Sequence, residues 1–466
     1  MQSRRDQAQA QSYLTGRLAS ALVAAEPDAL ETPHRRTMTG LLTGVLVAAL
    51  VVGGFTLYGF LVPGGSTRWR TPGTLVVEKE TGSRYLLVDG RLRPILNYSS
   101  ALLLLGAAPS VVQVSAKSLR GVPHGQPLGI VGAPDTLPAG GFDGTRWSVC
   151  ATGARDLAGA ALTATTLAVG HGPAGEAGVA LGDGQAIVAR VAGDTVRHLV
   201  WAGRRFRMTE TWTPAVLGYE AEPVAVSAAW LDLLPAGPDL GPIDVPGRGE
   251  PGPRVDGRVT RIGQLFAVSA AGAEDRYYLL RREGLARLTA TGYALLLGDP
   301  ATAAAYTGAP VTALPLSPAA LTPTALTDAA VLPDGLPSAP PPAVTGPNWC
   351  VVAVPGAAPA VEVQPPLGAG DVVRPGLGTT RNDHTADAVA IGPGLGGLAR
   401  GGRAGAEPSG TYYLVTDAGV KYPIANAEAV KTLGYDPQNP SVLDPALLGL
   451  LPTGPALDPA TARGNA

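Results

Sequence analysis

The sequence predicts an α+β protein: a cytosolic helix, one transmembrane helix and an elongated extracytoplasmic region of four ββα-like repeats around a β-rich core that a disulfide ties together. Three observations support this fold class: a long apolar segment near the N-terminus, a motif that recurs four times after it, and two cysteines in similar contexts. The 62 glycines and 44 prolines follow no fixed period, which favours many short elements joined by turns over long helices.

Residues 41–62, LLTGVLVAALVVGGFTLYGFLV, carry no charged side chain. As a helix that rises 1.5 Å per residue, the segment would reach about 33 Å, enough to cross the ~30 Å hydrocarbon layer of a bilayer. A buried core helix could be as apolar, but most globular helices end after roughly 10–14 residues. A cleaved signal peptide would have a shorter apolar region nearer the N-terminus. The segment therefore predicts a permanent membrane anchor.

Basic residues on the two sides of this segment predict its orientation, because the side richer in Lys and Arg stays cytoplasmic. The basic residues before it are Arg4, Arg5, Arg17, Arg35 and Arg36, and those shortly after it are Arg68, Arg70 and Lys79. The imbalance predicts a single-pass cell-membrane protein with a cytoplasmic N-terminus and an extracytoplasmic C-terminal domain.

Residues 1–40 combine an amphipathic helix with a basic juxtamembrane segment. The apolar residues spaced three and four apart are Ala10, Tyr13, Leu14, Leu18, Ala21 and Leu22, and Pro27 and Pro33 end the pattern. A short isolated amphipathic helix is marginal in water, so its apolar stripe needs a partner or the membrane surface. We expect Tyr13, Leu14, Leu18 and Leu22 to form a partner-binding face; the alternative is a loosely ordered tail.

The four repeats share one pattern: a short apolar run, a tight turn, a second run, and a helix-like stretch that ends in Leu-Gly. The copies begin at Tyr85, His198, Tyr278 and Tyr413 and close at Gly106, Gly218, Gly298 and Gly434. Asp89-Gly90 and Ala202-Gly203 suit hairpin turns with positive φ, and each closing glycine is placed to end a helix in the left-handed conformation.

A second short helix is expected nine or ten residues after three of the closing glycines. Its candidate N-caps are Ser115, Ser227 and Asp444, and Pro445 occupies the favoured first helical position. In the third copy Ser317 offers a similar cap only after an insertion.

Extra segments separate copies one and two, and copies three and four. The first contains WSVC at 147–150 and the second contains NWCVV at 348–352, and each includes a run that is typical of a strand, at 185–191 and 361–364. We therefore expect the two segments to form one central sheet, tied by a disulfide between Cys150 and Cys350, with the repeats flanking it in pairs of approximate twofold order. The alternative is two separate buried thiols.

These elements predict the following domain boundaries: 1–40 cytosolic helix and juxtamembrane segment, 41–62 transmembrane helix, 63–139 repeat 1, 140–192 core part A, 193–256 repeat 2, 257–340 repeat 3, 341–405 core part B, and 406–466 repeat 4 with the C-terminal tail.

Signatures of nucleotide binding are weak or missing in the sequence. A P-loop requires Gly-Lys followed by Ser or Thr, and none of the four lysines follows a glycine. GPGLGG at 392–397 matches G-x-G-x-x-G, but it lies in a Gly-rich loop without a convincing strand before it or a helix after it. The net charge of −2 also predicts no nucleic-acid partner.

Hydrolase and metal signatures are also missing from the sequence. The five histidines include no H-E-x-x-H pair, and no G-x-S-x-G elbow is present. Asn382, Asp383 and His384 form a polar triplet of the kind that caps turns, and we expect solvated loop residues there rather than an Asp–His dyad. We therefore predict no catalytic, cofactor-binding or metal-binding residue.

Several short motifs together resemble the EccB family, the single-span subunit of the actinobacterial type VII (ESX) secretion membrane complex. They are RRDQ at 4–7, the Arg pair at 35–36, VEKETG at 77–82, NYSSA at 97–101, GAPD at 132–135 and YPI at 422–424. The resemblance covers essentially the whole chain. It implies assembly with EccC, EccD and EccE type subunits. Self-association and binding of cell-wall polymer are further alternatives that the resemblance does not itself imply.

Two classes of function follow. The first is a structural subunit whose extracytoplasmic domain builds the outer face of a secretion complex, with no cofactor. The second is a non-standard ATPase that uses ATP, since the family is sometimes labelled so; the missing Walker A motif favours a protein that is not an enzyme. A cell-wall-binding module is a further alternative.

Overall fold

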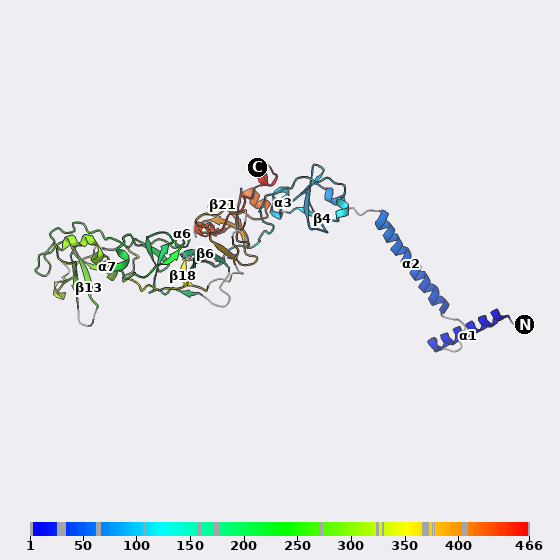
Figure 1. Ribbon diagram of the computed structural model, residues 1–466, viewed down its shortest axis with the longest axis horizontal. Coiled ribbons are helices and arrows are strands. Elements are labelled where there is room, and N and C mark those ends of the chain that lie inside the picture. Colours follow the sequence, from blue (N-terminus) through cyan, green and yellow to red (C-terminus); the bar gives the residue numbers. More distant parts are fainter. Residues whose placement is uncertain are drawn as a thin grey trace. The chain divides into compact units, whose positions relative to one another are not determined.

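The computed structural model describes residues 3–25, 34–61, 67–106, 108–155, 161–170, 178–269, 272, 274–322, 326–328, 330–365, 372–374, 376, 378–402 and 409–464. It is a mixed α+β chain with several small sheets (Figure 1). The chain divides into two compact units, Met1–Pro94 with Ser110–Gln126, and Ile95–Pro109 with Pro127–Ala466.

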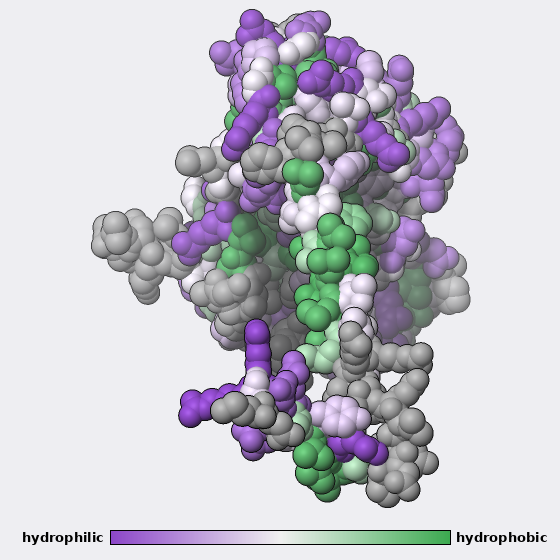
Figure 2. Space-filling view, turned by 90° about the vertical axis from the view of Figure 1, so that its right-hand side faces the viewer, coloured by the Kyte–Doolittle hydropathy of each residue, from purple (hydrophilic) through white to green (hydrophobic). Residues whose placement is uncertain are grey.

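Two long helices precede the sheets. Helix α1 (Arg4–Ala24) is capped by Ser3, whose side chain accepts a hydrogen bond from the backbone N–H of Arg5. Helix α2 (His34–Leu61) contains Thr37–Tyr58, 22 residues with a mean hydropathy of 2.2, which are long and apolar enough to cross a membrane. Figure 2 shows this helix as a column of hydrophobic side chains. It begins a few residues before the apolar segment that the sequence marks.

The first repeat sheet has four strands in the order β3-β2-β1-β4, in which β4 runs parallel to β1. Its elements are η1 (Thr67–Arg70), β1 (Thr74–Glu78), β2 (Arg84–Val88), β3 (Arg91–Pro94), β4 (Ser110–Val114) and α4 (Ala116–Leu119), with α3 (Tyr98–Leu105) between β3 and β4 in sequence. Trp69, Val76 and Leu92 are buried in the core of this sheet.

Repeats 2 and 4 have the same strand order, β10-β9-β8-β11 and β22-β21-β20-β23. Repeat 2 consists of β8 (Ile187–Val191), β9 (Arg197–Trp201), β10 (Arg204–Arg207), α5 (Thr213–Val216), β11 (Val224–Val226) and α6 (Ala228–Asp232). Repeat 4 consists of β20 (Gly397–Gly401), β21 (Ser409–Val415), β22 (Lys421–Ile424), α8 (Ala427–Thr432), β23 (Ser441–Leu443), α9 (Pro445–Gly449) and α10 (Pro459–Ala462).

Repeat 3 keeps the pattern and adds one edge strand, giving the order β15-β12-β13-β14-β16. Its elements are β12 (Leu265–Val268), β13 (Arg276–Arg281), β14 (Gly284–Leu288), α7 (Ala290–Gly298), η2 (Pro300–Ala305), β15 (Leu314–Pro315), η3 (Pro318–Ala320) and β16 (Leu326–Thr327).

Each repeat is therefore larger than the ββα unit expected from the sequence. One strand precedes the hairpin and pairs with it, and another follows the helix and lies parallel to that first strand. The run at 185–191 was expected in the central sheet, but as β8 it pairs with β9 and β11 of repeat 2. The pattern of residues marks a strand correctly, but it carries no information about which neighbour completes its hydrogen bonds.

The turn and cap residues behave largely as expected. Asp89, Gly90, Ala202 and Gly203 all have positive φ, as the hairpin turns require. Ser227 and Asp444 cap α6 and α9 by accepting hydrogen bonds from Trp230 N–H and Ala446 N–H, and Ser317 caps η3. Ser115 occupies the N-cap position of α4, but its side chain makes no capping hydrogen bond.

Gly298 departs from the expected role of the closing glycines. Gly106, Gly218 and Gly434 have positive φ, whereas Gly298 is the last residue of α7 and lacks it. A Cβ at this position would lie 2.1 Å from Cγ1 of Val216 at the end of α5. Gly298 is thus required by close helix packing rather than by a left-handed cap.

The central sheet combines both extra segments in the order β19-β6-β5-β17-β18-β7. Its strands are β5 (Trp147–Arg155), β6 (Ala161–Val169), β7 (Val179–Ala180), β17 (Asn348–Ala353), β18 (Ala360–Val363) and β19 (Ala388–Ile391). The first three come from the segment between repeats 1 and 2, and the others from the segment between repeats 3 and 4. This joining of two distant segments into one sheet agrees with the expectation from the sequence.

Three buried cores connect these elements. The central sheet shares a core with α6 of repeat 2 and α9 of repeat 4, where the indole N–H of Trp230 donates to the Trp349 carbonyl at 3.1 Å. Repeats 2 and 3 share a second core, and α3 shares a third with repeat 4. The pairing of repeats 2 and 3 follows from the packing of α5 against α7.

Candidate functional site

The disulfide lies at the centre of the sheet that joins the two distant segments. Cys150 of β5 and Cys350 of β17 are direct partners in the antiparallel register, with their Cα atoms 4.0 Å apart. Their sequence separation is 200 residues, and both side chains are buried. The bond therefore joins two strands that are separated in the chain by repeats 2 and 3.

The disulfide lies on the polar face of this sheet. Side chains alternate along a strand, so Trp147, Val149 and Ala151 enter the hydrophobic core while Ser148 and Cys150 point to the opposite face. The polar residues Ser148, Asn348 and Gln364 are nonetheless 1%, 3% and 5% exposed. Buried polar groups of this kind must be hydrogen-bonded if the sheet is to be stable.

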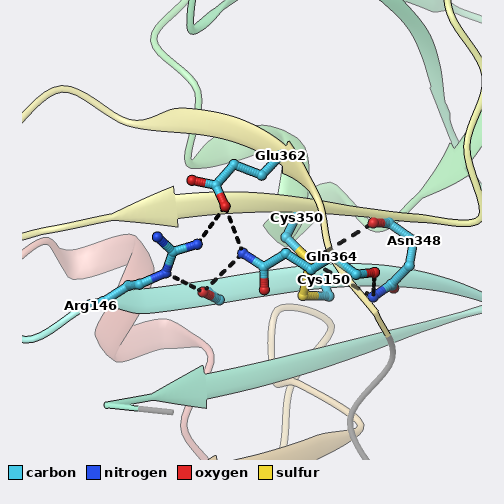
Figure 3. A network of polar contacts seen from close by, with 7 residues as sticks. Arg146, Cys150, Asn348, Cys350, Glu362 and Gln364 are labelled. Carbon is cyan, nitrogen blue, oxygen red and sulfur yellow. Dashed lines mark hydrogen bonds and ion pairs between the residues drawn. A yellow bond between two sulfur atoms is a disulfide. The ribbon is translucent and has the colours of Figure 1, made fainter. Parts of the chain in front are cut away.

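A connected set of hydrogen bonds satisfies these groups (Figure 3). The Asn348 amide donates to the Gln364 carbonyl at 2.9 Å, and its oxygen accepts from Thr152 Oγ1 at 2.8 Å. The Gln364 side-chain amide donates to Glu362 Oε2 at 3.2 Å and to Ser148 Oγ at 3.5 Å.

Arg146 completes the network by forming an ion pair with Glu362. The guanidinium Nε also donates to Ser148 Oγ at 3.4 Å. Arg146 belongs to the first extra segment and Glu362 to the second, so the ion pair adds a second link between the strands that the disulfide joins. This arrangement fixes the register of the strands, and its one carboxylate, Glu362, is engaged by Arg146 and by the Gln364 amide.

The second polar cluster surrounds His384. Its Nε2 lies 3.5 Å from Oδ2 of Asp232, at the end of α6, and Asp232 also pairs with Arg205 at 2.6 Å. A cavity of about 460 Å³ beside it is lined by Thr163, Thr165, Ser227, Arg381, His384 and Asp387, among others. The sequence predicted solvated loop residues here, and Asp383 and His384 are both exposed. The proximity of Asp232 was not predicted, because it arises only in the folded chain.

The Ser227 hydroxyl beside this cavity is engaged in hydrogen bonds, whereas Thr163 Oγ1, also in the lining, is buried without a partner among the described residues. Ser227 Oγ accepts from Thr165 Oγ1 at 2.7 Å and also caps α6. Thr165 N–H donates to Asp387, which itself pairs with Arg381 at 3.1 Å. These contacts connect the loop 381–387 to the central sheet and to repeat 2, so the cluster stabilises the packing of these three segments.

The glycine-rich run at 392–397 connects two strands, β19 and β20, and no helix follows it. Cβ atoms on Gly396 and Gly397 would lie 2.6 Å from the Val415 carbonyl oxygen and 2.2 Å from the Gly140 carbonyl oxygen. The glycines therefore permit close backbone contacts. A dinucleotide site would instead place the run between a strand and a helix N-terminus.

Metal-binding geometry is also missing from the part of the chain that the structure describes. Within it, no three or more His, Cys, Asp or Glu side chains are grouped so as to hold an ion.

The candidate partner-binding face of α1 is exposed. Tyr13, Leu14, Leu18 and Leu22 are 63%, 60%, 64% and 84% exposed, on a helix whose other described residues are mostly polar or small. The structure thus places the four residues on a helix, as the sequence suggested, with Leu14, Leu18 and Leu22 four residues apart and Tyr13 next to Leu14. Their role in binding remains a prediction.

The fold and these sites define a protein that has, in its described part, one candidate membrane helix followed by four related sheets around a disulfide-linked core. A family model described as "Type VII secretion system ESX-1, transport TM domain B" matches residues 1–465, so the chain belongs to the EccB family of type VII secretion proteins.

Curated relatives are about a quarter identical to this chain over the residues that align. The protein named ESX-2 secretion system ATPase EccB2 of Mycobacterium tuberculosis is 28% identical over 310 residues, which cover 65% of this chain and 60% of that protein. The match thus spans less than two thirds of that relative. The ESX-3 secretion system ATPase EccB3 of Mycolicibacterium smegmatis is 26% identical over 477 residues, 97% of this chain and 88% of the relative.

Solved structures show the same fold. A chain from the periplasmic assembly of the ESX-5 inner membrane complex matches with a TM-score of 0.67 and 25% identity, covering 86% of this chain and 97% of that one. A chain from an intact ESX-5 inner membrane complex matches with a TM-score of 0.64 and 24% identity, covering 99% and 95%.

Proposed function

We propose that the chain is a structural, membrane-anchored subunit of a type VII secretion complex, with its large C-terminal domain forming part of the outer face of that complex. The observation that carries the proposal is the construction of the central core. A disulfide, an ion pair and side-chain hydrogen bonds all join the same two distant segments. Such cross-links resist deformation, which suits a scaffold.

The orientation in this proposal places the N-terminus in the cytoplasm. The larger number of arginines before the span supports it. A disulfide in the C-terminal domain is also consistent with an oxidising compartment outside the membrane.

The proposed partners are EccC, EccD and EccE type subunits and a second copy of this chain. Two related structures are described as an ESX-5 inner membrane complex and as an EccB3 dimer, which supports assembly of this kind. The names of the curated relatives also include the word ATPase. The present sequence has no Gly-Lys-Ser/Thr loop, so it offers no Walker-type site for that activity.

Helix α1 is the proposed point of attachment to the cytosolic part of the complex. Burying a large apolar side chain contributes about 1.5–3 kcal/mol, and the membrane anchor raises the local concentration of the helix near its partners. The four exposed side chains on α1 therefore suffice to hold the subunit in place once the cost of ordering the helix is met.

The test replaces Leu14 and Leu18 by Asp in the full-length chain. We expect the variant to remain in the membrane but to be lost from the solubilised complex. The matched control is Ser12→Asp with Ala19→Asp, which adds the same charge to exposed positions seven residues apart on the opposite face of α1. Co-purification of the Leu14→Asp/Leu18→Asp variant with its partners at the wild-type ratio would refute the attachment by α1.

A further inference from the structure

Repeats 2 and 4 place a basic side chain at the same position of the third strand. Arg205 in β10 forms a parallel bridge with Ala236, and Lys421 in β22 forms a parallel bridge with Thr453. The backbone hydrogen bonds of the two residues also match. Arg205 N–H donates to the Pro235 carbonyl, and Lys421 N–H donates to the Pro452 carbonyl. The two residues are therefore structural equivalents.

The partner of this basic group differs between the two repeats. In repeat 2 the Arg205 guanidinium lies 2.6 Å from the carboxylate of Asp232, the last residue of α6 and the fifth after the N-cap Ser227. The corresponding last residue of α9, the fifth after the N-cap Asp444, is Gly449. Repeat 4 thus keeps the cation and has a glycine at the position that carries the carboxylate in repeat 2.

Lys421 is a buried cation with little to compensate its charge. It is 9% exposed, its Nζ donates to the Leu448 carbonyl at 2.5 Å, and it lies 5.6 Å from the centre of the Tyr413 ring. In the described part of the chain it takes part in no ion pair. Burial lowers the pKa of the Lys421 ammonium, because an isolated buried charge is costly.

A cavity of about 450 Å³ adjoins this lysine. Its lining includes Lys421, Gly449, Tyr413, Leu448 and the hydroxyl-bearing Ser409 and Thr411. A Cβ placed on Gly449 would have no atom within 4 Å, so the space next to the missing side chain is open. Among its described lining residues the cavity thus offers one cation and three hydroxyl-bearing side chains, with apolar and glycine surfaces around them.

We propose that this cavity binds a small aliphatic carboxylate, whose anionic group takes the place beside Lys421 that Asp232 takes beside Arg205. A carboxylate carries a single charge, which one lysine balances, whereas a phosphate dianion would need a second cation. The Leu448 and Pro445 side chains in the lining suit a short apolar chain on the ligand. The proposal concerns a ligand site in repeat 4 and does not depend on the assembly proposed above.

The test uses the full-length protein in detergent with [ε-¹³C]lysine, because the chain has only four lysines and their resonances can be followed individually. Sodium propionate is the probe, and propionamide is its neutral isostere. We expect propionate to shift the Lys421 resonance saturably and to raise the pKa of its ammonium toward the usual range, since an anion favours the charged form. Propionamide should have an effect at least tenfold weaker.

Lys421→Met should abolish propionate binding, and two further variants keep the test decisive if that protein does not fold. Gly449→Asp rebuilds the carboxylate of repeat 2, so it should raise the Lys421 pKa without ligand, raise the Tm and weaken propionate binding at least tenfold. Gly449→Asn fills the same space without charge and should raise neither the pKa nor the Tm.

Three results would overturn the proposal. One is a Lys421 resonance that does not respond to saturating propionate, and another is an equal response to propionate and propionamide. The third is a change in the Lys421 pKa of ligand-free protein on Glu407→Gln, a position outside the described residues, because that would identify a carboxylate of the chain itself as the partner.

Discussion

Adding one methyl group at Gly298 should disrupt the packing between repeats 2 and 3. In Gly298→Ala the new Cβ would lie 2.1 Å from Cγ1 and 2.9 Å from Cβ of Val216. Rotation of the valine side chain can move Cγ1, but Cβ is held by the backbone of α5. The helices must therefore separate, and overpacking of this kind costs typically 1–3 kcal/mol.

A smaller favourable effect opposes this cost. Replacing Gly by Ala in a helix stabilises it by roughly 0.5–1 kcal/mol, and less at its last residue, where Gly298 lies. The net expectation is a loss of about 0.5–2.5 kcal/mol in the opening free energy of the core that repeats 2 and 3 share. Since 1.4 kcal/mol is a factor of ten, amide exchange there should become roughly 2- to 60-fold faster.

Hydrogen–deuterium exchange of the full-length protein, read on peptides from α5 and α7, measures this effect. The matched control is Gly449→Ala, which also changes the last residue of a short helix but meets no atom within 4 Å. It should leave exchange unchanged or slower. Adding Val216→Ala to Gly298→Ala should recover most of the loss, and equal exchange in the two glycine variants would refute the packing argument.

Two further predictions concern the disulfide and pH. Replacing Cys150 and Cys350 by Ala should lower the free energy of unfolding by up to about 5 kcal/mol, the chain-entropy value for a closed loop of about 200 residues. Non-reducing peptide mapping of the wild type should recover the two cysteine peptides as one linked species, and two alkylatable thiols in the native protein would contradict the pairing. Burial, with Arg205 and Arg207 nearby, lowers the pKa of His198 below its usual value of 6.5. The unfolded chain therefore takes up this proton first, so the stability that His198 contributes is present above pH 6.5 and lost as the pH falls below it. The Tm of His198→Gln should fall less than that of the wild type between pH 7.5 and pH 5, and parallel curves would refute this.

The sequence by itself determined the features that depend on neighbouring residues. The length of an uncharged segment is enough to mark α2, since a bilayer core has a known thickness. Asp89-Gly90 specified a hairpin turn, and Asp444-Pro445 specified the start of α9, because caps and turns are interactions within a few residues. The two Trp-flanked cysteine contexts also identified the strands that meet in the central sheet.

Tertiary structure alone decided the features that depend on residues far apart in the chain. Strand β8 has the pattern of any half-buried strand, and only its hydrogen-bond partners assign it to repeat 2. Gly298 resembles the other closing glycines in sequence, yet the contact that requires it comes from Val216 in another repeat. His384 pairs with Asp232 rather than with its neighbour Asp383. The difference between Asp232 beside Arg205 and Gly449 near Lys421 is seen only when repeat 4 is compared, element by element, with repeat 2. In each case the deciding atoms come together through packing between distant segments, which no short-range pattern encodes.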